Sequence, residues 1–437
     1  MTSASASASS AGSATPPTPG GRTDVAFQDA LQVATGIAAR SPSSHNCQPW
    51  GVGWATDAAT RCTAAALLAT AAPGERAGDG PGLPRRSEYL VLALDRARRL
   101  TALPAHEVEM LLSCGAYGEI LARALAAQGW RADGIRFLGR EDTGDDGLFG
   151  DRWPRAWRPL CVVRLSPAPA DPDGLAALRD TVRARHTNRG PYRAEAIDPA
   201  VLARLSSPDP EPSLFRTHPR VTVHHLVTDA ERAAVAGLVA RYGGRDFAHL
   251  AAWRETHAYI RRDEADAERG GDGFTLGQLF GAMSPPRRWG MRAALAPATM
   301  RLLRHVGYDR FLARQLAAAV RGTPAIVALC FERCDGPGDS GGPDGPGGSG
   351  GPGDRVPDAG SGLRAGAALA GYWLGATRAG LALHPVSIVL QHDDVRAAFE
   401  RRLGLPGRAF FVSRLGHAVA AFPPSHRLAP SRALRHV

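Results

Sequence analysis

The sequence contains no lysine, because all 52 of its basic residues are arginine. A lysine Schiff base is therefore excluded as a catalytic device. The six cysteines form no C-x-x-C pair, Cys330 and Cys334 are too isolated for a zinc site, and most of the thiols are expected to be reduced and buried. The sequence also lacks a Ser-His-Asp nucleophile elbow and a phosphate-binding glycine loop followed by Lys-Ser or Lys-Thr.

No apolar run is long enough to predict a membrane-spanning helix. Residues 1–22 are rich in Ser, Ala, Thr, Pro and Gly, and they lack the basic start and apolar segment of a secretory signal. We predict a disordered tail for them. Hydrophobic residues make up 44% of the sequence and charged residues 22%, which is the balance of a soluble globular protein. These features predict a cytoplasmic protein without a membrane partner.

The formal net charge of +10 has three explanations. The abundance of Ala, Gly, Arg and Pro favours codon usage in a GC-rich genome. Anion binding is the functional alternative, since a guanidinium binds phosphate through two parallel hydrogen bonds. Nucleic-acid binding is the least favoured, because the arginines are scattered and no reading motif accompanies them.

The pattern of apolar residues predicts alternating helices and strands. The expected helices are 25–39, 106–129, 175–185, 198–205, 230–241, 247–262, 363–380 and 393–403, and the expected strands are 52–54, 88–93, 160–165, 221–227, 325–331, 381–386 and 409–415. Gly115 and Gly118 inside the second helix predict close packing against another element or a ligand.

Two α+β halves are predicted, covering residues 23–168 and 175–437 with a proline-rich linker between them. Residues 264–300 include an irregular stretch, 270–295, which we interpret as a lid. Residues 335–362 consist almost entirely of Gly, Pro, Asp and Ser, and they are predicted to be a disordered insertion.

Residues 41–50, Ser-Pro-Ser-Ser-His-Asn-Cys-Gln-Pro-Trp, crowd many hydrogen-bonding groups into one turn. Ser41 precedes a proline and is pushed out of the helical region, so the preceding helix ends there. Composition alone favours a connector between helix and strand. The alternative is a turn that presents donors to a flat polar ligand.

Taken together, several segments resemble the nitroreductase superfamily of FMN proteins. Residues 41–50 are similar to the family's S-P-S-S-x-N-x-Q-P-W signature, and residues 185–189, Arg-His-Thr-Asn-Arg, are similar to its R-[RH]-[ST]-x-[RK] signature. Residues 374–386, 403–406 and 415–417 resemble its later landmarks, so the resemblance covers most of 25–432. It implies two fused nitroreductase-like halves, each with a mostly antiparallel central sheet flanked by helices.

The order of the motifs departs from that of ordinary family members. There the arginine motif precedes the serine motif in one subunit, and the flavin lies at a dimer interface. Here the serine motif lies in the first half and the arginine motif in the second. The arrangement resembles two-domain actinobacterial proteins in which one chain mimics the dimer. It implies a monomer with one composite site, while the scattered arginines predict no nucleic-acid partner.

The resemblance also implies the cofactor-binding residues. Arg185 and Arg189 would hold the phosphate and ribityl chain, and Arg185 would lie near the pyrimidine side of the ring. Without the resemblance these arginines fit a basic helix C-terminus that interacts with its own dipole. The complete predicted set is Arg185, His186, Thr187, Arg189, Pro42, Ser43, Ser44, Asn46, Pro385, Val386, Ser387 and Arg427, with no metal ligand and no assigned acid or base.

Two positions differ from the family pattern. Ser425 stands where the family usually has lysine two residues before the arginine matched by Arg427, which removes one charge near the phosphate. Ser387 replaces the usual glutamate or glycine near flavin N5. His45 occupies a variable position, and we interpret it as a packing or hydrogen-bonding residue.

The predicted function is an FMN-dependent oxidoreductase that transfers hydride between flavin N5 and a small organic substrate, such as a nitro compound, a quinone or a biosynthetic intermediate. NAD(P)H is the expected reductant. The first alternative is a protein that stores or sequesters FMN under the lid without turnover. The second is a flavin-free interaction protein.

Overall fold

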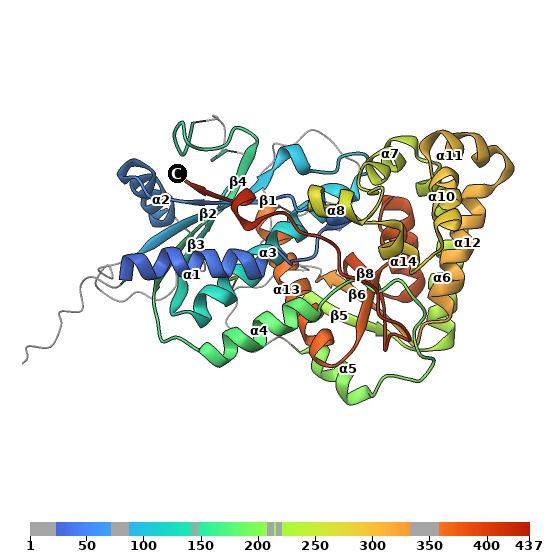
Figure 1. Ribbon diagram of the computed structural model, residues 1–437. Coiled ribbons are helices and arrows are strands. Elements are labelled where there is room, and N and C mark those ends of the chain that lie inside the picture. Colours follow the sequence, from blue (N-terminus) through green and yellow to red (C-terminus); the bar gives the residue numbers. More distant parts are fainter. Residues whose placement is uncertain are drawn as a thin grey trace, which may run out of the picture.

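The computed structural model of the protein describes residues 23–70, 87–139, 141–142, 147–207, 214–215, 221–332 and 358–437 (Figure 1). The predicted tail and most of the predicted insertion lie outside these residues. The described chain is a mixture of helices and mostly antiparallel strands arranged in two sheets. The α+β prediction is therefore confirmed.

The first sheet has the strand order β3-β4-β2-β1-β9. Neighbouring strands are antiparallel except for β1 and β9, which pair in parallel. The strands of this sheet are β1 (Trp50–Trp54), β2 (Glu88–Asp95), β3 (Trp130–Phe137), β4 (Trp157–Pro167) and β9 (Leu434–His436). The C-terminal strand therefore completes a sheet whose other strands all come from residues 50–167.

The second sheet has the order β5-β6-β8-β7 and is antiparallel throughout. Its strands are β5 (Val221–Leu226), β6 (Ala325–Phe331), β7 (Ala382–Pro385) and β8 (Arg408–Gly416). Strand β6 is buried along almost its whole length, which explains why it reads as a continuous apolar run in the sequence.

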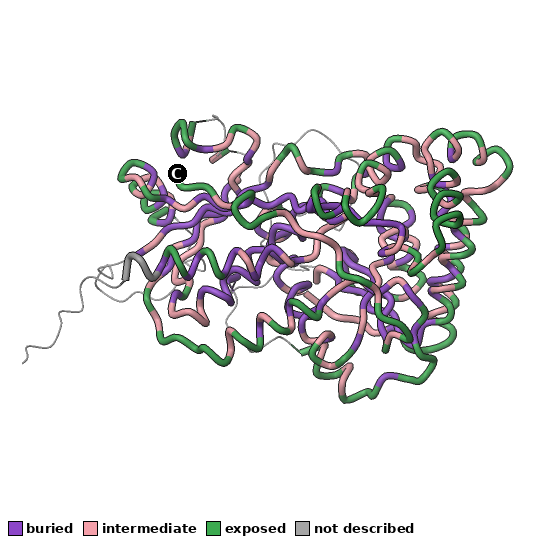
Figure 2. Tube along the Cα trace, viewed as in Figure 1, coloured by how far each residue is buried: buried purple, intermediate pink, exposed green. Residues whose placement is uncertain are grey.

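Two buried helices, α3 (Ala105–Ala127) and α13 (Ala359–Arg378), pack against each other in the middle of the molecule (Figures 1 and 2). A Cβ atom at Gly115 would lie 2.1 Å from the carbonyl oxygen of Leu363, and one at Gly366 would lie 2.3 Å from that of Leu112. Glycine is therefore required where the two backbones meet. This confirms the close packing predicted for Gly115.

Both sheets are built onto this helix pair. One apolar cluster joins α3 and α13 to the first sheet and to α1 (Thr23–Ala38), and a second joins them to β6 and β8. Helices α2 (Ala58–Ala69) and α4 (Pro172–Ala184) pack on the side of the first sheet and the central helices, whereas α5 (Pro199–Ser206) packs against β5 and α13 in the second cluster.

Helices rather than loops fill the region predicted as irregular. The segment after β5 contains α6 (Asp229–Ala248), α7 (Leu250–Ala258), α8 (Glu264–Gly270), α9 (Leu276–Phe280), α10 (Pro285–Ala294), α11 (Pro297–Leu303) and α12 (Tyr308–Arg321). The prediction of an irregular 270–295 is therefore wrong. Two of these short helices are followed by Gly271 and Gly281, whose φ values are positive. The frequent Gly and Pro residues of this segment therefore indicate the ends of short helices and not one long loop.

The end of the predicted insertion is also corrected. Helix α13 begins at Ala359, so residues 359–362 are helical rather than disordered. Gly360 and Gly362 are buried, and a Cβ atom at Gly362 would lie 2.7 Å from the Leu111 side chain. These glycines allow close helix packing. Composition alone does not distinguish such glycines from those of a low-complexity segment.

Helix α14 (Asp393–Leu403) matches its predicted bounds. Asp393 and Asp394 begin it and Arg401 and Arg402 end it, so its charges complement the helix dipole. By length and composition α3 is apolar enough to cross a membrane, with a mean hydropathy of 1.2. However, 89% of that window is buried by the rest of the protein, so α3 is a core helix.

Candidate functional site

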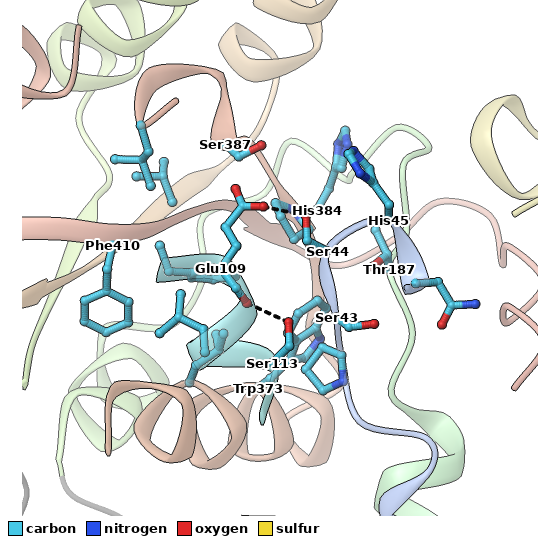
Figure 3. Close-up of a pocket in the computed structure, with 18 of the residues that line it drawn as sticks. Ser43, Ser44, His45, Glu109, Ser113, Thr187, Trp373, His384, Ser387 and Phe410 are labelled. Carbon is cyan, nitrogen blue, oxygen red and sulfur yellow. Dashed lines mark hydrogen bonds between the residues drawn. The ribbon is translucent and has the colours of Figure 1, made fainter. Parts of the chain in front are cut away.

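A cavity of about 310 Å³ lies where the serine-rich turn, α3, α13, the arginine segment and the C-terminal strands meet. Of the twelve residues predicted from the motifs, all but Val386 line it. The lining members are Pro42, Ser43, Ser44, Asn46, Arg185, His186, Thr187, Arg189, Pro385, Ser387 and Arg427. Val386 is instead buried in the apolar cluster between β8 and α14. Segments far apart in the sequence therefore share one cavity (Figure 3).

The serine-rich turn has a strained backbone. His45, Asn46 and Gln48 have φ values of 50°, 53° and 51°, in the left-handed region that non-glycine residues rarely adopt. Each such residue costs of the order of 1–3 kcal/mol unless its surroundings hold it. Ser43 contributes one restraint, because its Oγ accepts a hydrogen bond of 3.0 Å from the backbone N–H of Gln48.

Side-chain amides supply most of the restraint. Asn46 Nδ2 donates at 2.9 Å to the carbonyl oxygens of both Gly273 and His426. Gln48 Nε2 donates to the carbonyl of Gly271 at 2.8 Å. Asn46 lines the cavity as predicted, but its amide is used within the protein. We therefore assign it to positioning the cavity wall.

The arginine segment follows α4, which ends at Ala184. Thr187 forms a parallel bridge with Leu383 of β7, so the chain brings residues 185–189 alongside residues 384–387. The Arg185 guanidinium lies over the Trp373 ring at 4.8 Å, and its Nη2 donates to the Arg40 carbonyl at 2.9 Å. This packing fixes the position of a buried cation.

Three arginines that line the cavity, Arg185, Arg189 and Arg427, have no acidic partner within the described chain. Burial, reinforced by the charge of Arg40, lowers the pKa of Arg185 to about 10, and burial lowers the pKa of Arg189 to about 10. Burial, then the charges of Arg185 and Arg40, lower the pKa of Arg427 to about 9. Arg185 is buried and Arg189 and Arg427 are half-buried, and unpaired cations in such places are unfavourable, so the cluster suits an anionic ligand.

The strand β7 side of the cavity carries His384, Pro385 and Ser387 (Figure 3). Burial, with the nearby charges of Arg189 and Arg414, holds the pKa of His384 well below its usual value. The imidazole is therefore neutral at ordinary pH. Its Nδ1 lies 3.1 Å from Nη1 of Arg414, where a neutral ring can accept the hydrogen bond.

Part of the predicted lid forms a wall of the cavity. Phe274 and Gln278 line it, and the Arg189 guanidinium lies 5.6 Å from the Phe274 ring centroid. The wall is tied to the first sheet's side of the molecule by Asp272, which forms an ion pair with Arg98 at 2.5 Å. Helices α10 and α11 contribute no lining residue.

His45 lies in a cluster of rings and titratable groups beside this wall. Its ring lies 6.3 Å from that of Tyr259 and 6.2 Å from that of His106. Burial, then the charge of His106, lower the pKa of His45 to about 4. A neutral ring suits its place among these buried groups, and His45 also lines the cavity.

The sequence interpretation missed Glu109 and Trp373, which also line the cavity. Glu109 accepts a hydrogen bond of 2.5 Å from the Ser44 hydroxyl (Figure 3). It precedes Leu112 and Ser113 by one helical turn and therefore shares their face of α3. A carboxyl group on a mostly apolar helix was the signal that could have revealed Glu109.

The two mostly antiparallel sheets, the shared cavity and the sequence relationship below define one class: the chain belongs to the nitroreductase superfamily. It is 32% identical over 402 residues, 92% of both chains, to a Serratia protein described as "Probable NAD(P)H nitroreductase PigM". No family model matches the sequence.

Solved structures with similarity to the chain include two proteins of related description. The FMN-dependent nitroreductase NfnB from Mycobacterium smegmatis, in complex with NADPH, is 13% identical, with a TM-score of 0.33 over 60% of this chain and 98% of that one. A nitroreductase-like family protein from Bacillus cereus is 9% identical, with a TM-score of 0.30 over 59% of this chain and 94% of that one.

Proposed function

We propose that the protein is an FMN-dependent oxidoreductase that takes its electrons from NAD(P)H and acts on a small organic substrate in the cavity. The observation that carries the proposal is the convergence of Arg185, Arg189 and Arg427, without acidic partners in the described chain, on a cavity also lined by the serine turn. The description of the Serratia relative as an NAD(P)H nitroreductase supports the same activity.

The residues present fit a phosphorylated flavin. The Nε–H groups of Arg185 and Arg427 are buried without a hydrogen-bond partner, and a phosphate supplies the acceptors they lack. The cavity, at about 310 Å³, lies in the range of ligand pockets, roughly 300–1,000 Å³. Its lining combines these cations with apolar side chains such as Leu112 and Phe410.

Each part of the cavity has a defined task in this proposal. Arg185, Arg189 and Arg427 hold the phosphate and the polar chain of the cofactor, and Ser43 and Ser44 approach the ring edge. FMN, when bound, supplies the hydride-transfer chemistry. The protein supplies positive charge, orientation and the exclusion of water by the wall around Phe274.

One chain is sufficient to build this site. Residues 42–46 of the serine turn line the same cavity of one chain as Arg185, Arg189 and Arg427. The proposal therefore predicts a monomer that retains FMN. Light scattering during size-exclusion chromatography, with flavin absorbance recorded on the same peak, tests this; flavin confined to a dimer peak contradicts it.

The test of function is the absorption spectrum of the purified protein before and after NADPH under anaerobic conditions. The proposal expects a yellow protein that NADPH bleaches and that a quinone or nitro compound reoxidises. A yellow protein that neither NADPH nor NADH reduces indicates FMN storage instead. A colourless protein that fails to bind added FMN contradicts both functions.

A further inference from the structure

Glu109 is the one acidic side chain among the described residues that line the cavity. It projects from α3 toward the space between Ser44 and Ser387 (Figure 3). It is half-buried and forms no ion pair with a described residue, whereas Arg396 and Arg408, which also line the cavity, form ion pairs with Asp393. The cavity therefore presents a negative group as well as the three arginines.

Two neighbours fix the orientation of this carboxylate. Ser44 Oγ donates to Oε2 at 2.5 Å, and Gln391 Nε2 donates to Oε1 at 2.9 Å. Each carboxylate oxygen can accept two hydrogen bonds, so both keep accepting capacity. Because the Ser44 hydrogen is directed at Glu109, the Ser44 oxygen is left with lone pairs to offer rather than a proton.

Gln391 adds a further unused acceptor. Its side chain is 6% exposed, and its Oε1 is buried without a hydrogen-bond partner. Ser44, Glu109 and Gln391, which we call the acceptor group, thus carry several unused acceptor positions against one unused donor, the second N–H of the Gln391 amide. Of the three residues, Ser44 and Glu109 line the cavity, and Gln391 lies behind Glu109. A buried group of this kind is completed by a ligand that brings N–H or O–H donors.

The surroundings strengthen the preference. Val108, Leu112 and Leu390 also line the cavity, and an apolar lining reduces the screening of charge. Glu109 would repel a ligand carboxylate placed beside it, whereas it would attract an ammonium, amine or hydroxyl group.

We propose that Glu109 recognises the substrate by accepting a hydrogen bond from it, so that the substrate class is a neutral or cationic small molecule with an N–H or O–H donor. This proposal rests on the proposed function, because it requires the cofactor to occupy the part of the cavity lined by the three arginines and the substrate to lie between the cofactor and the acceptor group. Ser44 and Gln391 act as positioning residues that hold the carboxylate in its accepting orientation.

The test compares matched probes on the purified protein. Dissociation constants for 4-nitrobenzylamine, 4-nitrobenzyl alcohol and 4-nitrobenzoate are measured by calorimetry without NADPH, so that binding is read without turnover. The wild-type protein should bind the amine and the alcohol at least about tenfold more tightly than the carboxylate, since a hydrogen bond to a charged group contributes about that factor.

Glu109→Gln keeps the size of the side chain but removes its charge, and it should reduce this ratio to about threefold or less. Glu107→Gln is the matched control, because Glu107 is on the same helix but exposed, and it should leave the ratio unchanged. Glu109→Asp is the second variant, for use if Glu109→Gln fails to fold. It keeps the charge but shortens the side chain by one methylene, so it should still bind the amine and the alcohol more tightly than the carboxylate.

Equal binding of the three probes by the wild-type protein overturns the proposal, as does an unchanged ratio in Glu109→Gln. Its failure is distinguishable from failure of the proposed function. Glu109→Gln should keep the flavin content of the wild type, so an unchanged probe ratio in a yellow variant counts against the role of Glu109 alone. A wild-type protein that is colourless and does not bind added FMN contradicts the proposed function instead.

Discussion

Arg427 Nη1 donates a hydrogen bond of 2.8 Å to Oδ1 of Asn46, a residue 381 positions earlier in the chain. One of the two family signatures is thereby joined to an arginine from the C-terminal segment. The carbonyl oxygen of Arg40 accepts hydrogen bonds from both Arg427 and Arg185 and extends this connection to the arginine segment. The walls of the cavity are therefore mechanically coupled rather than independently placed.

Asn46→Ala should destabilise the protein. The substitution removes the Asn46 donor from the carbonyl oxygen of Gly273 and one of the two donors to that of His426, and it places alanine at a φ of 53°, which asparagine tolerates better. We expect a loss of about 2–4 kcal/mol in the free energy of unfolding. Chemical denaturation checks this. Gln32→Ala, at an exposed position of α1, is the control, and an equal effect of both would contradict the anchoring role.

Arg185→Ala combined with Arg189→Ala should remove most of the bound FMN. The pair deletes two of the three unpaired cations that line the cavity, and each charge-assisted contact to a phosphate contributes about 1.5–3 kcal/mol. Flavin content after purification, and the dissociation constant for added FMN, are the measurements. Arg183→Ala with Arg193→Ala removes the same charge from exposed positions and should retain FMN. Unchanged flavin content in the first pair would refute the assignment.

Acid should destabilise the protein partly through His45. Its pKa is about 4 in the folded protein and about 6.5 when unfolded, so between these values the unfolded chain binds more protons. The stability it contributes is complete above about pH 6.5 and is lost as the pH falls toward 4, by about 2–3 kcal/mol.

His45→Asn removes the titrating ring, and asparagine suits the left-handed backbone at this position. The variant should therefore lose less stability between neutral pH and about pH 4 than the wild type does. Urea unfolding at a series of pH values measures the difference. His417→Asn, at an exposed position, serves as the control, and a variant whose pH dependence matches that of the wild type rules out this role for His45.

Gly366→Ala should separate α3 from α13. The added Cβ would lie 2.3 Å from the backbone oxygen of Leu112, which has no room to move without shifting the helix. Overpacking of this kind costs about 1–3 kcal/mol or more. Thermal unfolding should show a lower midpoint. Gly36→Ala in α1, where nothing lies within 4 Å, should instead raise the midpoint by relieving a helix-interior glycine, so the two substitutions have opposite expected signs.

Local sequence information predicted the elements that depend on local chemistry. The predicted bounds of β6 and α14 match the structure, because a continuous apolar run and a charge-capped amphipathic helix are both readable over a few residues. The strand β3 was missed, since its Arg131 and Asp133 interrupt the apolar pattern. The pairing of β9 with β1 was missed as well, because it is set by contacts across the whole chain.

The candidate site likewise contains residues that the sequence predicted and roles that it did not. The two motifs carry their residue types locally, so the resemblance led to residues that line one cavity. The roles of Glu109 and of the Asn46 amide are set by residues more than 60 positions away in the sequence. Glu109 is placed in the site by its hydrogen bond with Ser44, and the Asn46 amide is used by the carbonyl of Gly273. Neither partner is marked in the sequence, so only the three-dimensional arrangement reveals them.

The pairing of β9 with β1 also has a consequence for synthesis on the ribosome. The backbone N–H of Val437 bonds to the Trp54 carbonyl, and the Val437 carbonyl accepts from Thr56, 381 residues away. At roughly 5–20 residues per second, translation leaves β1 without this neighbour for tens of seconds. During that time it is an exposed strand edge, the kind of surface on which nascent chains associate wrongly. Chaperone occupancy of nascent chains should therefore persist until the C-terminal strand has emerged.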